Sequence, residues 1–305
     1  MMSIYLPIAE MPVNALLILV MSGAVGFVSG LVGVGGGFLM TPLLMFLGIP
    51  PAVAASTEAA QITATSVSGM LAYWRRKLVD WRMGLLLTAG GIAGSIAGVR
   101  LFAAMKQIGQ IDLLITLSYV FFLSVIGGLM LWESIGALRR KSRGLPPARR
   151  KRSRTIAHAL PLKMRFPTSG LYISVFPPLV IGFVVGVLAA IMGVGGGFIL
   201  VPAMIYLLRM PTQVVVGTSL VQVLIVTSLV VVLQSVQTRT VDMVLAVLLI
   251  IGGVIGAQLG VRAGARLSAE RLRATLAVLV LGTGMKLLYD LIATPGEMYV
   301  LGSAR

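Results

Sequence analysis

The same glycine-rich sequence occurs twice in this chain, 160 residues apart. Residues 33–44 read GVGGGFLMTPLL and residues 193–204 read GVGGGFILVPAM. Each copy interrupts a strongly apolar segment with glycines, which remove side-chain bulk and permit backbone angles that other residues avoid. A near-identical interruption at matching places indicates a duplicated unit, so the fold must be built from two related halves.

The composition predicts that both halves lie in a membrane. Of the 305 residues, 58% are hydrophobic and only 11% are charged, too few charges for the surface of a soluble protein. Apolar stretches close to the length that crosses a bilayer core, about 20 residues, recur along the chain. They are residues 13–32, 52–73, 83–104, 113–132, 178–192, 212–233, 243–261 and 272–292. We therefore expect an all-α polytopic membrane protein.

The net charge of +16 comes largely from one polar stretch. Eleven of the 25 Lys and Arg residues lie in residues 139–165, and no acidic residue occurs between Glu133 and Asp242. We interpret this stretch as a cytoplasmic loop that fixes orientation and touches anionic lipid headgroups. A nucleic-acid arm is disfavoured because no aromatic residues alternate with the charges.

The chain has no cysteine and a single histidine, His158, in the basic stretch. These counts exclude disulfides, thiolate metal sites and iron–sulfur clusters. The apolar segments contain no His/Asp/Glu cluster or thiol nucleophile, so we expect neither an enzyme nor a bound cofactor or metal. The first ten residues lack Lys and Arg, and the first apolar segment is therefore expected to remain in the protein rather than be removed as a signal peptide.

The repeat extends beyond the glycines and sets the expected domain boundaries. Val79 and Asp80 match Val241 and Asp242, and a stripe of glycines follows each pair at a constant offset of 162 residues. We divide the chain into a first transmembrane repeat (1–136), a basic cytoplasmic linker (137–170) and a second transmembrane repeat (171–305). The stripes are Gly90, Gly94 and Gly98 in the first half and Gly252, Gly256 and Gly260 in the second; their spacing predicts close helix packing rather than ligand contact.

The basic residues favour halves of opposite orientation. If each glycine cluster lay within a single crossing, both halves would point the same way and residues 262–273 would lie outside, against the positive-inside rule. A turn at the cluster instead gives each half five segments: a broken helix or hairpin plus three full spans. The basic stretches 75–82, 139–165 and 262–273 then all face the cytoplasm, and both termini lie outside.

The segments after the glycines are too short to cross a membrane. Residues 38–49 and 198–208 would each form a helix of about 17 Å, so paired with the preceding segment they form hairpins or broken helices that meet near mid-membrane. The N-terminus of such a helix offers free N–H groups and a positive dipole to an anion; tight hairpin packing without a ligand is the alternative. The candidate glycines are Gly35, Gly36, Gly37, Gly195, Gly196 and Gly197.

Polar side chains follow each short segment in an otherwise apolar span. Their hydroxyls and amides can donate to an oxyanion without contributing charge, although hydrogen bonding between helices is an equally ordinary role. The candidates are Thr57, Gln61, Thr218 and Gln222. Glu58 is the carboxylate well inside a first-half span and is a candidate for proton coupling, unless it lies hydrated at the outer interface. Ser219 stands at the matching position of the second half.

The duplicated glycine cluster, followed by Pro42 and Pro202 and separated by a polar loop, resembles the TauE/SafE sulfite exporter family, also called the toluene-sulfonate uptake permease family. The resemblance implies an inner-membrane secondary transporter for a small sulfur-containing anion such as sulfite, thiosulfate or an organosulfonate. The alternative is a channel-like or non-transporting membrane scaffold. No nucleotide-binding motif is present, so we do not expect direct drive by ATP.

Overall fold

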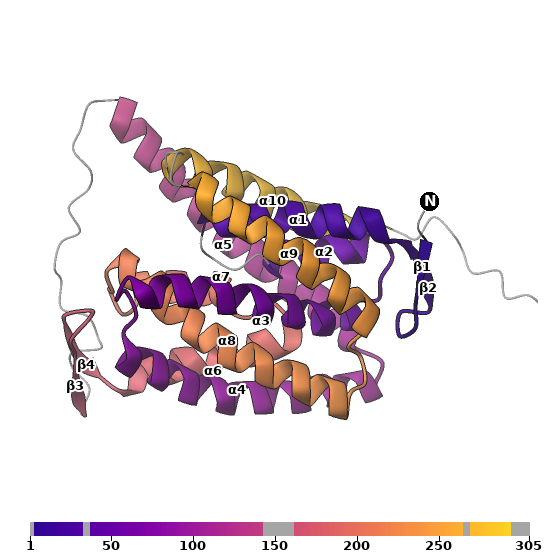
Figure 1. Cartoon of the computed structure of the whole chain (residues 1–305), viewed down its shortest axis with the longest axis horizontal. Helices are drawn as coiled ribbons and strands as arrows, with labels where there is room; N and C mark the ends of the chain where they lie inside the picture. The colour runs from indigo at the N-terminus through magenta and orange to yellow at the C-terminus, as the bar shows by residue number, and fades with distance from the viewer. Residues whose placement is uncertain (1–2, 33–36, 143–161, 265–268, 294–305) are drawn as a thin grey trace, which may run out of the picture.

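The computed structural model describes residues 3–32, 37–142, 162–264 and 269–293, and in these residues the two halves have the same order of elements (Figure 1). Each half begins with a β-hairpin and continues with one helix, one short helix and three long helices. The first half contains β1 (Ser3–Leu6), β2 (Met11–Asn14), α1 (Ala15–Val32), α2 (Gly37–Phe46), α3 (Pro51–Arg75), α4 (Trp81–Gln107) and α5 (Ile111–Ser142). The second contains β3 (Lys163–Phe166), β4 (Leu171–Ser174), α6 (Phe176–Met192), α7 (Gly197–Tyr206), α8 (Thr212–Gln237), α9 (Met243–Gly264) and α10 (Ala269–Ile292).

Local sequence signals explain where several helices begin and end. Pro51 starts α3, where the missing N–H of proline has no intrahelical partner to lose. Asp80 caps α4 by accepting a hydrogen bond from the Met83 N–H at 3.2 Å. Gly193 ends α6 in the left-handed conformation, with φ 71°, which glycine adopts without steric cost. The short segments after the glycines are indeed helices of ten residues, α2 and α7.

Four helices in the described part of the chain are long and apolar enough to cross a membrane. They are residues 81–107, 111–132, 214–237 and 243–263, and they coincide with four of the eight apolar stretches expected from the sequence. The stretches at 13–32 and 178–192 form shorter apolar helices, α1 and α6. Residues 52–73 lie in α3, a long helix that also carries Glu58 and Gln61.

Two β-hairpins were not expected from the sequence. β1 pairs antiparallel with β2, and β3 pairs antiparallel with β4. They lie at opposite ends of the helix bundle (Figure 1). The range expected to be a linker, 137–170, includes the last residues of α5 and all of β3. The turns of the two hairpins include a left-handed residue each, Glu10 at φ 53° and Gly170 at φ 65°.

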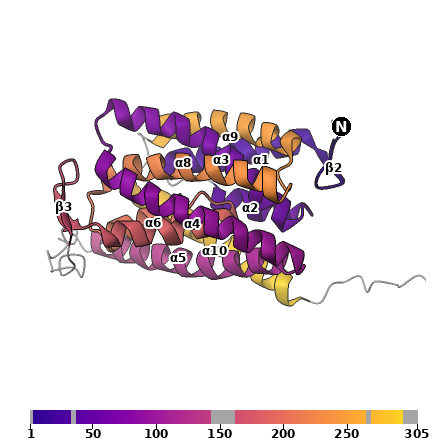
Figure 2. The same ribbon diagram turned by 90° about the horizontal axis from the view of Figure 1, so that it is seen from below.

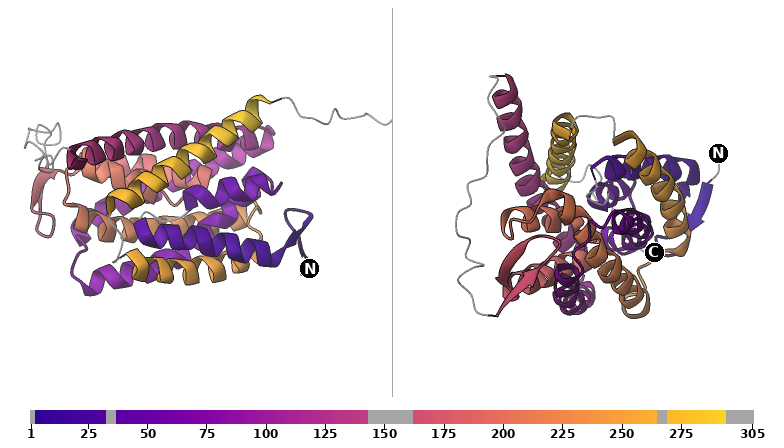
Figure 3. Two further views of the ribbon diagram at one scale, coloured as in Figure 1. Left: turned by 90° about the horizontal axis from the view of Figure 1, so that it is seen from above. Right: turned by 60° about the vertical axis from the view of Figure 1, so that its left-hand side comes forward.

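Helices of one half pack mainly on helices of the other. α1 runs along α9, α6 along α4, α3 along α8 and α5 along α10 (Figures 2 and 3). The glycine stripes permit the first two contacts: a Cβ at Gly94 would lie 2.0 Å from the Phe183 carbonyl oxygen, and one at Gly256 would lie 2.0 Å from that of Gly23. The expected role of the stripes in close helix packing is confirmed.

Candidate functional site

The two short helices meet at the buried centre of the protein. Phe38 and Phe198, the second residues of α2 and α7, stack with ring centroids 4.4 Å apart and an angle of 13° between the ring planes. Both side chains are only 2% exposed. The stack holds the N-termini of α2 and α7 side by side, as the sequence led us to expect for two broken segments.

The turn between α6 and α7 depends on glycine. Gly193, Gly195 and Gly196 all have positive φ, of 71°, 68° and 74°, a region costly for residues with a Cβ. A Cβ at Gly193 would lie 1.8 Å from the carbonyl oxygen of Ala55, so the turn also rests directly on the backbone of α3.

The start of α7 has the features of an anion site. Gly196 is the N-cap residue of α7, and its carbonyl accepts from the Leu200 N–H at 2.7 Å. The N–H groups of the first helical residues, Gly197 and Phe198, have no carbonyl one turn back within the helix. Free N–H groups at a helix N-terminus attract negative charge. In the first half, Gly37 begins α2 and is buried; Gly35 and Gly36 lie outside the described residues.

Ile62 of α3 fills the space between Gly37 at the start of α2 and Gly195 in the turn before α7. A Cβ added to Gly37 would lie 2.1 Å from Ile62 Cδ1, and one added to Gly195 would lie 2.6 Å from Ile62 Cγ2. The Ile62 side chain is 1% exposed. The absence of a Cβ at both glycines therefore makes room for one branched side chain at the centre.

Glu58 lies against the start of α2 and is fully buried. Its side chain is 0% exposed, and a Cβ at Gly37 would be 3.3 Å from Glu58 Oε1. Neither carboxyl oxygen has a hydrogen-bond partner among the described residues. The alternative of a hydrated group at the outer interface is therefore wrong. Ser219, at the matching position, donates its hydroxyl to the Val216 carbonyl at 2.9 Å instead.

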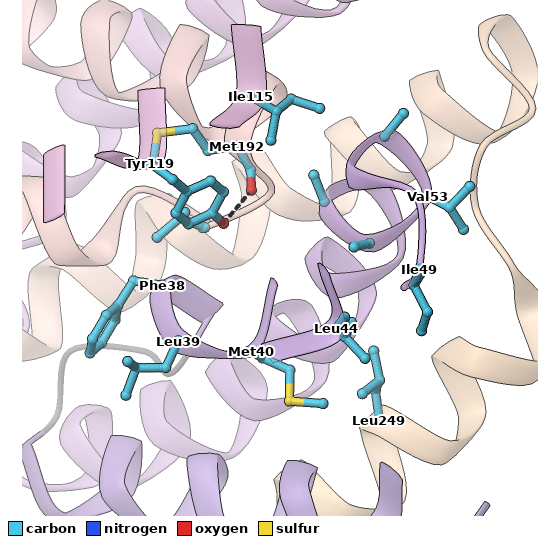
Figure 4. Close-up of a cluster of buried hydrophobic side chains, with 14 of the residues drawn as sticks. Phe38, Leu39, Met40, Leu44, Ile49, Val53, Ile115, Tyr119, Met192 and Leu249 are labelled. Atoms are coloured by element: carbon cyan, nitrogen blue, oxygen red, sulfur yellow. Dashed lines mark hydrogen bonds between the residues drawn. The ribbon is translucent and has the colours of Figure 1, made fainter. Parts of the chain in front are cut away.

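Two residues near Glu58 were missed from the sequence. The Tyr119 hydroxyl, on α5, donates to the Met192 carbonyl at 2.6 Å (Figure 4). The phenol lies near the Glu58 carboxyl and next to the Thr41 hydroxyl. No donor or acceptor among the described residues meets the distance and angle limits of a hydrogen bond to Thr41 Oγ1. The sequence contains a clue to Thr41: the second half has an apolar residue, Val201, at the matching position.

Gln61 and Gln222 occupy equivalent places beside glycines of the other half. Gln61 packs under Gly253 of α9, and Gln222 packs under Gly91 of α4. Both side chains are buried. The Gln61 Oε1 atom and both polar atoms of the Gln222 amide have no partner among the described residues, so these amides retain capacity to bind a polar ligand.

Thr57 and Thr218 lie at helix junctions rather than together. The Thr57 hydroxyl accepts from the Asp242 N–H at 3.0 Å, and the Thr218 hydroxyl accepts from the Asp80 N–H at 3.0 Å. These matched contacts are near opposite hairpins: the Asp242 carboxylate accepts from the Ile8 N–H at 2.9 Å.

The Asp80 carboxylate makes the corresponding contact at the other end of the bundle. It accepts from the backbone N–H of Ser169 at 3.1 Å and from the Ser169 hydroxyl. Each hairpin is thus tied to the aspartate that caps a helix of the other half. Asp80 and Asp242 are therefore packing groups at the starts of α4 and α9.

The fold and this buried centre define a multi-pass membrane protein of the transporter class, in which interrupted helices bring their N-termini to a central site. The chain matches the family model described as Sulfite exporter TauE/SafE over residues 18–287. Because this match covers most of the chain, the protein belongs to the TauE/SafE family of membrane transporters.

Individual relatives are similar over much of their length. The chain is 29% identical to the probable membrane transporter protein YjnA of Bacillus subtilis, covering 89% of this chain and 98% of that protein. It is 31% identical to the probable membrane transporter protein YunE of the same organism, covering 67% and 72%. A shorter match, 36% identical over 38% of this chain, joins it to Sulfite exporter TauE/SafE family protein 3 of Arabidopsis thaliana, of which it covers 25%. No solved structure matches the chain significantly.

Proposed function

We propose that the protein is a secondary transporter that moves a small sulfur-containing anion, such as sulfite, thiosulfate or an organosulfonate, across the inner membrane. The observation that carries the proposal is the buried meeting of the α2 and α7 N-termini, marked by the stacked Phe38 and Phe198 rings. The N–H groups at the start of α7, those of Gly197 and Phe198, then bind the oxyanion. Charge on the substrate is balanced by dipoles rather than by a fixed cation, which favours reversible binding.

The wider site includes the predicted polar side chains. The Gln61 and Gln222 amides, which have unpartnered atoms, contact the substrate from α3 and α8. Thr57 and Thr218 hold the helix junctions between the halves, where their hydroxyls accept the Asp242 and Asp80 N–H groups, and so position α3 and α8 beside the site. Glu58, buried beside Gly37, binds the coupling ion.

We further propose that the halves are inverted repeats that alternate access around this site. Three observations support this arrangement: the hairpins lie at opposite ends of the bundle (Figure 1), α1 packs on α9 as α6 packs on α4, and Asp80 and Asp242 make equivalent contacts. The basic stretches then face the cytoplasm, where residues 137–170 contact anionic lipids.

Flux into proteoliposomes tests the proposal. Labelled sulfite, thiosulfate, sulfoacetate and taurine are supplied with and without an ion gradient, and we expect saturable, gradient-dependent uptake of at least one anion. Uptake that does not saturate favours a channel, and no uptake of any anion favours a scaffold.

A pair of glycine variants tests the site itself. Gly196→Val should abolish flux while the protein still reaches the membrane, because Gly196 has φ 74° and a Cβ there would lie 2.2 Å from Val185 Cγ1. Gly128→Val is the matched control, since no atom lies within 4 Å of a Cβ at that helical position. Normal flux through the Gly196 variant would contradict the site.

A further inference from the structure

Three buried oxygen atoms near the centre have no hydrogen-bond partner among the described residues. They are both carboxyl oxygens of Glu58 and the hydroxyl oxygen of Thr41. Both side chains are 0% exposed, and both lie near the Tyr119 phenol. Buried polar atoms are nearly always paired in native proteins, so this group of oxygens indicates a missing positively charged or donating ligand.

A fourth oxygen faces the same region. The Met192 carbonyl accepts the Tyr119 hydroxyl at 2.6 Å (Figure 4) and keeps a second lone pair. Met192 is the last residue of α6, where the helix dipole is negative. The next residue, Gly193, rests on Ala55 of α3, and Ala55 lies on the same face of α3 as Glu58, one turn away.

The repeat does not require these oxygens for folding. Residues that join the halves are kept in both copies, as in the matched contacts of Thr57 and Thr218. By contrast, the second half has Val201 in place of Thr41 and Ser219 in place of Glu58. A scaffold that folds with valine and serine at these positions does not need the polar pair, so the pair serves a purpose specific to the first half.

The donor set matches a hard monovalent cation. A carboxylate, a hydroxyl and a backbone carbonyl are the oxygen ligands that hard cations prefer, and half-helix C-termini coordinate sodium in other broken-helix transporters. Among the described residues, Glu58 is the carboxylate whose oxygens are buried without a hydrogen-bond partner. Its single negative charge balances a single positive charge.

We propose that Glu58, Thr41 and the Met192 carbonyl bind a sodium ion. A proton on Glu58 forms one hydrogen bond to one neighbouring oxygen, whereas one metal ion contacts several oxygens at once. Tyr119 holds the Met192 carbonyl in place through its hydroxyl. The Glu58 carboxylate also lies beside Gly37 at the start of α2, so the sodium ion neighbours the anion site. Its role as the coupling ion rests on the proposed function, but its binding does not.

Thermal unfolding of the purified protein in detergent measures the binding directly. NaCl is titrated against choline chloride at constant ionic strength, because a ligand that binds only the folded state raises the unfolding temperature. We expect sodium to raise the temperature saturably and choline to have no effect. Potassium chloride in a third series tests the selectivity for ion size. Displacement of radioactive ²²Na⁺ by unlabelled sodium gives the affinity independently of stability.

Variants that copy the second half test the ligands. Thr41→Val introduces the residue of Val201, and Glu58→Gln removes the charge; each should weaken sodium binding by at least about tenfold, the effect of losing about 1.4 kcal/mol. Ser219→Ala, a change of a buried side chain at the position equivalent to Glu58, should leave binding unchanged. Should Thr41→Val not fold, Thr41→Ser keeps the hydroxyl and should bind sodium as the unmodified protein does.

The outcomes separate this proposal from the transport proposal. Absence of any sodium-specific stabilisation or ²²Na⁺ displacement in the unmodified protein overturns the sodium site, as does unchanged binding in Glu58→Gln. If sodium binds but no sulfur anion is transported, the proposed function fails and the cation site stands. If anion flux is saturable and independent of sodium, and the protein does not bind sodium, the proposed transport function stands and the sodium site fails.

Discussion

Replacing Gly37 by alanine should create a steric overlap that a second substitution, Ile62→Val, relieves. The new Cβ would lie 2.1 Å from Ile62 Cδ1, 3.0 Å from Ile62 Cγ1 and 3.3 Å from Glu58 Oε1. Overpacking of this kind costs about 1–3 kcal/mol. Ile62→Val removes only the Cδ1 methyl group and by itself costs about 0.5–1.5 kcal/mol. The pair therefore tests one atom-to-atom contact at the centre.

A double-mutant cycle measures the relief. If the two effects were independent, the double variant would lose the sum of the two single losses. Because Ile62→Val deletes the atom that the new methyl group meets, we expect the double variant to be at least about 1 kcal/mol more stable than that sum. The free energy of unfolding in mixed detergent and denaturant gives the four values, and anion flux from the same preparations reports whether the site recovers.

Gly195 supplies the matched control. Its added Cβ would meet Ile62 Cγ2 at 2.6 Å, a methyl group that valine retains, and its φ of 68° adds about 1–2 kcal/mol of backbone strain for any residue with a Cβ. Ile62→Val should therefore not rescue Gly195→Ala. Additive losses in the Gly37 cycle, or equal rescue at both glycines, would refute the placement of Ile62 between Gly37 and Gly195.

Three further predictions concern the frame around the site. Thr218→Val should destabilise the protein by about 1–3 kcal/mol, measured by unfolding, because the buried Asp80 N–H loses its acceptor; an unchanged stability would show that another group replaces the hydroxyl. Gly94→Leu should prevent recovery of monodisperse protein, since a Cβ there would lie 2.0 Å from a carbonyl oxygen of α6; normal elution on size exclusion would contradict the close packing. Because the protein has no native cysteine, a single introduced cysteine reports its own location: an impermeant thiol reagent should label Ser3→Cys only from outside and Lys77→Cys only from the cytoplasm. The reverse pattern would exclude the proposed orientation.

The sequence alone determined the features that are encoded locally. Adjacent glycines weaken a helix locally, and the apolar segments after the two clusters are short, so two ten-residue helices, α2 and α7, were predictable from the sequence. Stripes of glycine at every fourth position mark one helix face, which predicted close packing at Gly94 and Gly256 before any partner was known. The apolar composition likewise fixed the membrane environment, because span length depends only on consecutive residues.

The hairpins at the two ends carried a weaker local signal. Each consists of strands of four residues, too short for a clear alternation of polar and apolar residues, and the first strand of the second hairpin lies within the basic linker. Their position is held by contacts with distant aspartates, such as that of Ile8 with Asp242. No reading of neighbouring residues could supply those partners.

Only the tertiary structure decided what the polar residues do. Thr57 and Glu58 are adjacent in sequence, and both were candidates for the site, yet the Thr57 hydroxyl is bonded to the start of α9 while the Glu58 carboxyl lies unpartnered beside Gly37. The unpaired hydroxyl of Thr41 lies near Tyr119 of α5, a neighbour that no local sequence pattern encodes. Successive helix positions point in different directions, and what each side chain meets depends on which helix packs there. That pairing is a long-range property, because the partners of α3 come from both halves of the chain.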